Sequence, residues 1–237
     1  MSLMAGAAKS AEIVVFSTIS AKEALLELVP EFERASGYKV NITYAGGSGL
    51  AERIRSGTRG DLFIGPEEFS GPLIDEGRLL AGSRTAFARS RTGLAVRAGA
   101  PKPDISSPEK LKSVLLAAGS VSYSAGASGM HFVRVLERLG IADAVAAKRV
   151  AARPGELVGA VVARGDADIG VQQVSELLPV PGIEILGPLP VELQQTITYG
   201  VTAFPQSTQR EAAQALVSFL RSEAARAVLR RKGLDPA

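Results

Sequence analysis

The chain has 237 residues, of which 46% are hydrophobic and 22% charged, a composition typical of a folded globular protein that excludes a disordered or low-complexity chain. It contains no cysteine, which excludes disulfides, thiolate metal ligands and thiol nucleophiles. The net charge of +3 arises from interleaved basic and acidic residues, and aromatic residues make up only 5%, so we expect no nucleic-acid partner.

The sequence also shows no sign of a membrane segment. No run of about 18 apolar residues is present, which is the length that a spanning helix needs. The opening stretch "MSLMAGAAKSAEIVV" has no charged segment followed by a long apolar one, so it does not have the pattern of a signal peptide. We expect residues 1–9 to be a tag or a disordered start.

Strand-like and helix-like segments alternate along the chain from residue 12 onward. Residues 12–18 predict a buried strand, and residues 20–37 carry apolar side chains at helical spacing, with Ser20 as a candidate N-cap and Gly37 as the stop. The next expected elements are a strand at 38–45, a helix at 47–57, a strand at 61–65 and a helix at 66–77. This order is typical of a mainly parallel, doubly wound sheet.

The second half repeats the alternation. The expected strands are 92–99, 120–124, 167–173 and 196–204. The expected helices are 106–119, 128–140, 154–165 and two within 207–233. No internal repeat of 20 to 50 residues is visible, which excludes a solenoid, so we expect an α/β protein with two lobes.

Three junctions between strand and helix share small, open residues. They are "FSTISAKEAL", "YAGGSGLAERI" and "SYSAGASGMHF", starting at Phe16, Tyr44 and Ser122. In an open α/β sheet, ligands bind beyond the carboxyl ends of the strands, where helix N-termini present free N–H groups. The junctions therefore predict a shared ligand site, although Ser20 and Ser48 could instead be plain helix caps.

Catalytic and metal chemistry find less support. The single histidine, His131, lies one turn into a predicted helix beside Phe132 and is interpreted as a structural residue. No serine-nucleophile elbow, phosphate-binding loop or dinucleotide fingerprint occurs, and Asp166 and Asp168 have no nearby partner set for a metal. We therefore expect no catalytic residues, no metal and no cofactor.

The chain resembles a known family from Glu12 to Pro236. The resemblance is carried by "VVFSTISAKEALLELVPEFERASG", "YAGGSGLAERIRSG", "GDLFIGPEE", "ASGMHFVRVLERLG", "LVGAVVARGDADIGV" and the C-terminal "AAQALVSFLRSEAARAVLRRKGL", in this order and spacing. It is similar to the type II periplasmic solute-binding proteins of ABC importers, in the branch that includes molybdate-binding proteins.

This resemblance implies two doubly wound α/β lobes joined by a two-stranded hinge, with crossovers near Ser90 and Thr196. Lobe one would comprise residues 10–90 and 197–237, and lobe two residues 91–196. In such proteins the lobes close over a small ligand in the cleft between them. That cleft is the same place as the site predicted from the junctions.

The resemblance also implies the ligand contacts. Serine hydroxyls and backbone N–H groups at helix starts hold an oxyanion in the molybdate branch, at positions that match Ser20, Ser48, Ser128 and the helix start around Gly155 and Glu156. The full set of expected ligand-binding residues is Thr18, Ser20, Gly47, Ser48, Ser128, Gly129, Gly155, Gln172 and Gln173.

One departure from the pattern bears on the ligand. Gln172 and Gln173 stand where the molybdate binders have a Val-Tyr pair, and glutamine both donates and accepts hydrogen bonds, whereas a fully deprotonated oxyanion only accepts them. An unpaired Glu156 would also repel a dianion. The ligand is thus either a molybdate- or tungstate-like oxyanion or a small organic acid or other polar solute.

The leading hypothesis is a periplasmic solute-binding component of an ABC transporter, a monomer that presents a small anionic ligand to a membrane permease, with its leader absent from this chain. The first alternative is an intracellular sensor or regulator with the same fold. The second is an enzyme that uses Ser48, His131 or a carboxylate on the bound solute.

Overall fold

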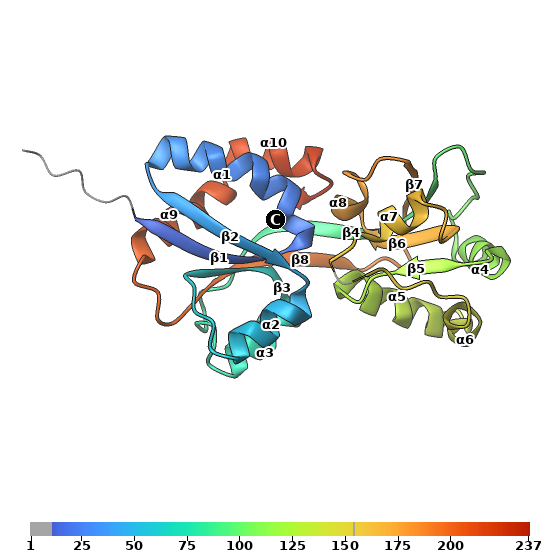
Figure 1. Cartoon of the computed structure of the whole chain (residues 1–237), viewed down its shortest axis with the longest axis horizontal. Helices are drawn as coiled ribbons and strands as arrows, with labels where there is room; N and C mark the ends of the chain where they lie inside the picture. Colours follow the sequence, from blue (N-terminus) through green and yellow to red (C-terminus); the bar gives the residue numbers. More distant parts are fainter. Residues whose placement is uncertain (1–10, 154) are drawn as a thin grey trace, which may run out of the picture.

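The structure is a computed structural model that describes residues 11–153 and 155–237. The predicted tag or disordered start at residues 1–9 lies outside the described residues. The described strands form one mixed, curled sheet in the order β2-β1-β3-β8-β4-β6-β5, with β7 and β9 added alongside β4. Figure 1 shows that this sheet carries two α/β lobes, with β4 and β8 running between them.

Lobe one contains both ends of the described chain. Its elements are β1 (Glu12–Thr18), the 3-10 helix η1 (Ile19–Ala21), α1 (Lys22–Ser36), β2 (Lys39–Ala45), α2 (Gly47–Arg55), β3 (Leu62–Pro66), α3 (Glu67–Asp75), the first half of β4 (Thr85–Arg97), β8 (Thr196–Ala203), α9 (Arg210–Leu220), α10 (Glu223–Arg231) and β9 (Asp235–Pro236).

Lobe two is built from the middle of the chain. Its elements are the second half of β4, then α4 (Pro108–Ala117), β5 (Val121–Tyr123), α5 (Ala127–Arg138), α6 (Ala142–Ala146), α7 (Val158–Ala163), β6 (Ile169–Gln173), α8 (Val174–Leu177) and β7 (Ile183–Pro188). No helix among the described residues has the length and apolar character to cross a membrane.

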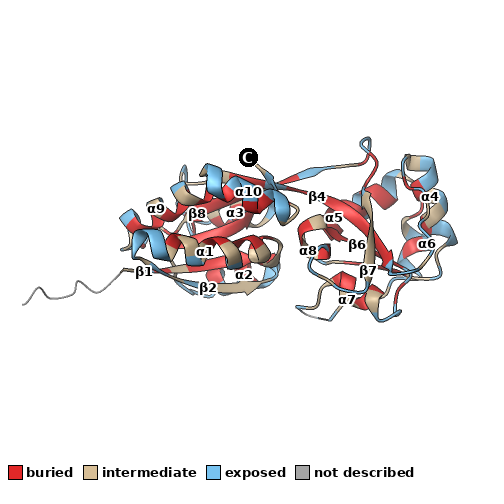
Figure 2. Cartoon of the chain, turned by 90° about the horizontal axis from the view of Figure 1, so that it is seen from above, coloured by how far each residue is buried: buried red, intermediate tan, exposed pale blue. Residues whose placement is uncertain are grey.

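The sheet of lobe one buries a different core on each face. Ile13 and Val15 of β1 face a cluster formed with α1, α9 and α10, while Phe16 faces a cluster formed with α2 and α3. Successive side chains of a strand point to opposite faces, so a strand covered by helices on both sides must be apolar throughout. Figure 2 shows the resulting concentration of buried residues in the strands. The doubly wound arrangement predicted from the sequence is confirmed here.

The strand directions differ from the expectation of a mainly parallel sheet. β1 pairs in parallel with β2 and β3, and β5 with β6, but β4 pairs antiparallel with β6, β7, β8 and β9, and β3 pairs antiparallel with β8. The two strands that run between the lobes insert against the direction of their neighbours. The sheet is therefore mixed.

The long strand β4 links the two lobes. Its residues 85–91 pair with β8 in lobe one, and from Thr92 onward it pairs with β6 in lobe two. The predicted crossovers near Ser90 and Thr196 lie beside this change of partner and at the start of β8. The sequence predicted a strand only from residue 92, because residues 85–91 include exposed Arg89 and Arg91.

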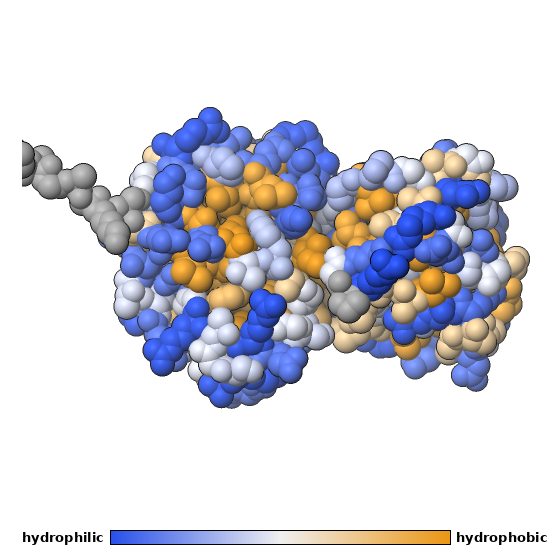
Figure 3. Space-filling view, in the orientation of Figure 1, coloured by the Kyte–Doolittle hydropathy of each residue, from blue (hydrophilic) through white to orange (hydrophobic). Residues whose placement is uncertain are grey.

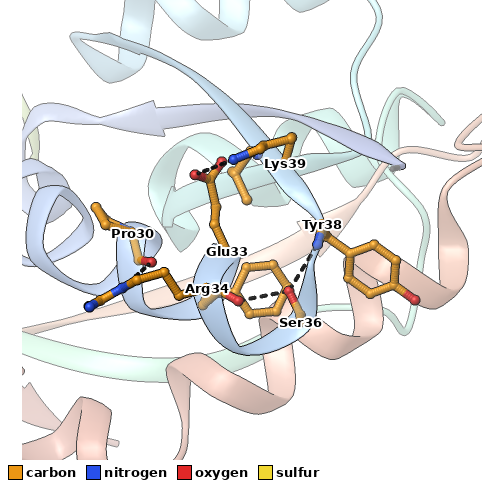
Figure 4. Close-up of polar contacts among 8 residues, drawn as sticks. Pro30, Glu33, Arg34, Ser36, Tyr38 and Lys39 are labelled. Carbon is orange, nitrogen blue, oxygen red and sulfur yellow. Dashed lines mark hydrogen bonds and ion pairs between the residues drawn. The ribbon is translucent and has the colours of Figure 1, made fainter. Parts of the chain in front are cut away.

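The end of α1 shows how the chain turns from helix to strand (Figure 4). The Ser36 hydroxyl donates to the Phe32 carbonyl at 2.7 Å and accepts from the Tyr38 amide at 3.2 Å. Gly37 adopts the left-handed conformation, with φ of 77°, which glycine reaches without a steric cost. The predicted helix stop at Gly37 is confirmed. After this turn the chain enters β2, which pairs in parallel with β1.

The C-terminal segment contacts both lobes. β9 pairs with Ala88 and Arg89 of β4, next to the crossover. Gly233, just before it, lies against α8 of lobe two: a Cβ atom added at Gly233 would be 2.6 Å from Leu178 Cδ1 and 3.2 Å from the Ser175 amide nitrogen. Only a residue without a side chain fits this contact.

Candidate functional site

A cavity of about 390 Å³ lies between the lobes, at the low end of the range of about 300 to 1,000 Å³ that ligand pockets span. In the space-filling view the lobes form two separate bulges (Figure 3). The residues from lobe one that line the cavity are Thr18, Ile19, Ser20, Gly46, Gly47, Ser48, Gly49, Pro66, Phe69 and Tyr199. Those from lobe two are Tyr123, Ser124, Ala125, Gly126, Ala127, Ser128, Arg149, Ala152, Arg153, Gly155, Glu156, Leu157, Gln172, Gln173 and Glu176.

The three junctions predicted from the sequence meet in this cavity. It is lined by the end of β1 with η1, by the start of α2 and by the start of α5. The described structure thus brings together all of the predicted ligand-binding residues except Gly129, which does not line the cavity. Whether they contact a ligand stays a prediction.

The two serines of lobe one are not helix caps. Ala21 occupies the N-cap of α1, because η1 comes between β1 and that helix, and Gly46 occupies the N-cap of α2. The interpretation of Ser20 as an N-cap is therefore wrong, and Ser48 lies within the first turn of α2. Neither hydroxyl caps the N-terminus of a helix, so both can bond to other groups in the cleft.

The predicted glycines have packing roles as well. A Cβ atom added at Gly47 would lie 2.2 Å from the Phe69 ring, and one added at Gly129 would lie 1.6 Å from the Ser124 carbonyl oxygen. Close approach of protein atoms therefore explains glycine at both positions without a ligand. Gly155 differs, since it has open space around it and a φ of 80° that favours glycine in a turn.

Several polar groups lie buried in the cleft without a partner. The Thr18 hydroxyl and both amide atoms of Gln173 form no hydrogen bond with the described residues, although Thr18 is 4% and Gln173 1% exposed. An unsatisfied buried polar group costs about 1 to 3 kcal/mol. A bound solute with hydrogen-bond donors and acceptors would recover this cost at Gln173.

Gln172 and Ser128 are already engaged within the protein. The Gln172 Oε1 atom accepts from the Val158 amide at 2.8 Å, which satisfies a free N–H group at the start of α7. The Ser128 hydroxyl lies 3.0 Å from that of Ser124. The two neighbouring glutamines therefore differ: the Gln172 acceptor helps to hold α7, whereas the buried Gln173 amide has no partner among the described residues.

Two arginines line the lobe two side of the cavity. Neither Arg149 nor Arg153 forms an ion pair with a carboxylate of the described residues. Arg149 lies over the Tyr123 ring, 4.2 Å from its centroid, which orients the guanidinium by a cation–π contact. The sequence analysis missed both residues, although they stand in "KRVAARPGELV", just before the predicted contact at Gly155.

The two acidic residues of the cavity differ in charge state. Glu156 is paired with Arg164, whose hydrogen bond lowers the pKa of Glu156, so the repulsion of an anion expected from Glu156 is offset. Burial raises the pKa of Glu176 to about 7, while hydrogen bonds from Ser20, the Gln173 backbone and Gln172 act in the opposite direction. Near neutral pH the cavity lining therefore contains two arginines with no ion pair among the described residues, the ionised Glu156 and the partly ionised Glu176.

Tyr199 completes the floor of the cleft. This side chain from β8 is 1% exposed, and burial, followed by the charge of Glu176, raises its pKa well above the ordinary value. The phenol stays protonated and can donate a hydrogen bond. The sequence analysis missed Tyr199 and Glu176, because Tyr199 falls inside the predicted strand 196–204 and Glu176 lies on a one-turn helix just after the glutamine pair.

His131 lies outside the cavity lining. It is 8% exposed, its Nε2 atom lies 2.8 Å from the Leu193 carbonyl oxygen, and burial lowers its pKa. These contacts fasten α5 to the segment that precedes β8. Among the described residues there is also no cluster of histidine, aspartate and glutamate that could hold a metal ion.

Residues 13–235 match the model of a family described as bacterial extracellular solute-binding proteins. The chain belongs to this family. The resemblance seen in the sequence and the expected solute-binding role are confirmed by that match.

Relatives of this solute-binding protein bear two kinds of name. It is 36% identical to a protein of a Pseudomonas species named aconitate isomerase, over 94% of this chain and 87% of that one. It is 24% identical to the molybdate-binding protein ModA of Escherichia coli strain K12, over 95% of this chain and 90% of that one. The expected absence of catalysis stays a prediction, since one relative is named as an enzyme.

A solved structure of similar fold is the Azotobacter vinelandii periplasmic molybdate-binding protein. The TM-score is 0.78 at 20% sequence identity, and the match covers 94% of this chain and 98% of that one. The predicted fold class of two α/β lobes is confirmed by this likeness.

Proposed function

We propose that this protein captures a small organic anion with several carboxylates in the cleft between its lobes. The observation that carries the proposal is the pair of cleft arginines, Arg149 and Arg153, whose guanidinium groups form no ion pair with a carboxylate of the described residues. The planar guanidinium matches a carboxylate through two parallel hydrogen bonds, and such charge-assisted bonds are stronger than neutral ones. Two arginines on one wall favour a ligand that carries more than one carboxylate.

The unpartnered amide of Gln173 supports an organic ligand over a simple oxyanion. Its Nε2 atom would donate to a carboxylate, but its Oε1 atom needs a donor such as a hydroxyl, a protonated carboxyl group or a bridging water. A tetrahedral oxyanion without protons offers acceptors only. A molybdate- or tungstate-like oxyanion is the alternative ligand, favoured by the relative and the solved structure that are named as molybdate-binding proteins.

Capture would proceed by closure of the lobes about β4 and β8. A ligand that contacts the serines of lobe one and the arginines of lobe two at once makes all of these contacts only in the closed form, so it shifts the population towards closure. In this role the protein acts outside the cytoplasm as a monomer and presents the closed form to an ABC permease.

Calorimetric titration tests the ligand class. The probes are citrate, cis-aconitate, trans-aconitate and tricarballylate on one side, and molybdate, tungstate and sulfate on the other. We expect at least one tricarboxylate to bind and the inorganic anions to bind weakly or not at all. Tight binding of molybdate or tungstate alone would contradict the proposal.

A second candidate function is isomerisation of an unsaturated tricarboxylate. It is favoured by the 36% identity to the protein named aconitate isomerase, and by a titratable carboxyl group, Glu176, in the cleft. Proton NMR of cis- and trans-aconitate incubated with the protein would measure it. A change in the isomer ratio that depends on protein concentration supports this candidate, and an unchanged ratio with bound ligand leaves capture alone.

A further inference from the structure

Glu176 occupies an unusual place in the cleft. It lies on α8, directly after β6, and its side chain is partly exposed to the cavity. It also lines an adjoining cavity that shares Ile19, Gly46, Gly155 and Leu157 with the first, so it stands where the two spaces meet. A ligand in either space would pass close to this carboxyl group.

No cation neutralises Glu176 among the described residues, in contrast to Glu156 with its Arg164 partner. Its neighbours are neutral hydrogen-bond donors: Ser20 from lobe one, and Gln172 with the Gln173 backbone from lobe two. The Ser20 hydroxyl lies within hydrogen-bonding reach of both Glu176 and Tyr199. A carboxyl group held in this way keeps the capacity to take up and release a proton.

We propose that Glu176 is a catalytic residue that moves a proton between two carbon atoms of an unsaturated polycarboxylate held in the cleft. This inference rests on the proposed function, and specifically on its second candidate. It assigns to the cleft an acid–base role that capture of a solute does not need.

The reaction balances within the substrate. In an aconitate-like molecule, a central carbon bearing a carboxylate is double-bonded to a CH carbon and single-bonded to a CH₂ carbon. The Glu176 carboxylate takes one proton from the CH₂ carbon, and the electron pair of that C–H bond forms a new double bond to the central carbon. The electrons of the old double bond move to the CH carbon, which then takes the proton back from Glu176. The double bond has moved by one position and Glu176 is again a carboxylate.

The surroundings of Glu176 suit both halves of this transfer. Because burial raises its pKa to about 7, both forms of the group are populated near neutral pH, which is where a general acid–base catalyst works best. Arg149 and Arg153 would hold the carboxylates onto which negative charge spreads as the proton leaves. The protonated Tyr199 phenol and the Ser20 hydroxyl add donors beside the reacting carbons.

The test compares wild type with E176Q and E176D in D₂O, with proton NMR following both the isomer ratio of aconitate and the entry of deuterium into its carbon positions. Binding is measured separately with tricarballylate, which has the three carboxylates but no double bond to move. Glu211, exposed at the start of α9, provides the matched control variant E211Q.

The expected result is that wild type and E211Q bind tricarballylate, interconvert the aconitates and exchange deuterium. E176Q should bind tricarballylate within about threefold of wild type and lose about 100-fold or more of both reactions, the range that general acid–base catalysis contributes. E176D, with a carboxyl group displaced by one methylene, should retain part of the exchange. Thermal unfolding of each variant checks that it is folded.

Three results would overturn the inference. Exchange by E176Q at the wild-type rate would show that another group moves the proton, and loss of tricarballylate binding in E176Q would make Glu176 a ligand-holding residue. Wild type that binds the tricarboxylates but neither changes the isomer ratio nor exchanges deuterium would refute proton transfer while leaving capture intact. If wild type binds none of them, the proposed function itself has failed.

Discussion

The two walls of the cleft are built from different chemistry. Lobe one presents uncharged groups at the ends of its strands, with Ser20 and Ser48 among its hydroxyl donors. Lobe two presents charged and amide side chains, with Arg149, Arg153 and Glu176 on loops and a one-turn helix. The neutral wall can receive almost any small anion, because backbone N–H groups and hydroxyls donate to any oxygen. We therefore expect selection among anions to depend on lobe two.

The largest expected effect follows from removing the charged wall. We expect the double variant R149A/R153A to weaken tricarboxylate binding by about 3 kcal/mol or more, since each hydrogen bond between charged partners is worth about 1.5 to 3 kcal/mol. Calorimetric titration measures the loss, and R210A on the exposed start of α9 serves as the control for lost positive charge. Equal affinity in R149A/R153A and wild type would contradict a role of the lobe two arginines in ligand binding.

The two lobes should also differ in how much stability they lose when a glycine in the first turn of a helix is replaced by alanine. At Gly129 the added Cβ atom would meet the fixed Ser124 backbone, whereas at Gly47 it would meet the Phe69 ring, which can move. We expect G129A to lower the free energy of unfolding by about 2 to 3 kcal/mol and G47A by less, on the scale of overpacking. Urea denaturation gives the values, and G49A, where nothing lies within 4 Å, should cost nothing. A milder effect for G129A than for G47A would contradict the rigid turn in lobe two.

The carboxyl group of the charged wall should make stability depend on pH. The pKa of Glu176 rises from its ordinary 4.5 to about 7 in the folded protein, so the folded state binds more protons than the unfolded state between these values. Stability from this group is therefore fully present below about pH 4.5 and lost as the pH rises through 7, a loss of about 3 kcal/mol. The difference in unfolding free energy between wild type and E176Q, measured from pH 4.5 to 8, should follow this curve. A constant difference would show that Glu176 is solvated.

The smallest effect should come from the neutral wall. S48A removes one exposed hydroxyl that has no partner among the described residues, so we expect a loss of about 1 kcal/mol in ligand affinity and no change in stability. S20A should cost more, because Ser20 also contacts Glu176 and Tyr199. Titration of both variants with the same tricarboxylate tests the order, and a larger loss for S48A would reverse it.

The sequence predicted the fold well where local patterns decide it. The buried strand at the start, the helix that ends at Gly37 and the three open junctions follow from apolar spacing and from the conformational freedom of glycine. Local patterns failed where a strand forms only because it pairs with a strand distant in the sequence. Residues 85–91 of β4 form a strand because β8 lies beside them, although their own alternation is broken by arginines.

The site was predicted only in its neutral half. Serine and glycine after a strand are a local signal, so the wall from lobe one could be found. Arg149 and Arg153 stand in a loop with no periodicity, and their lack of acidic partners is a property of the folded arrangement. The raised pKa of Glu176 likewise depends on burial between η1 and β6, which no stretch of sequence displays.

The contact between Gly233 and α8 lies outside the cleft, yet it acts on the helix that carries Glu176. A Cβ atom at position 233 would lie 2.6 Å from Leu178 Cδ1 and 3.2 Å from the Ser175 amide nitrogen, so Leu178 and the start of α8 would have to shift. We expect this shift to move lobe two slightly away from that part of lobe one. Such a change would alter the resting angle of the hinge, and with it the fraction of molecules ready to bind. Affinity scales with that fraction. Evolution can therefore retune how tightly this cleft holds its solute through a spacer at the far end of the chain, without altering any residue that the solute touches.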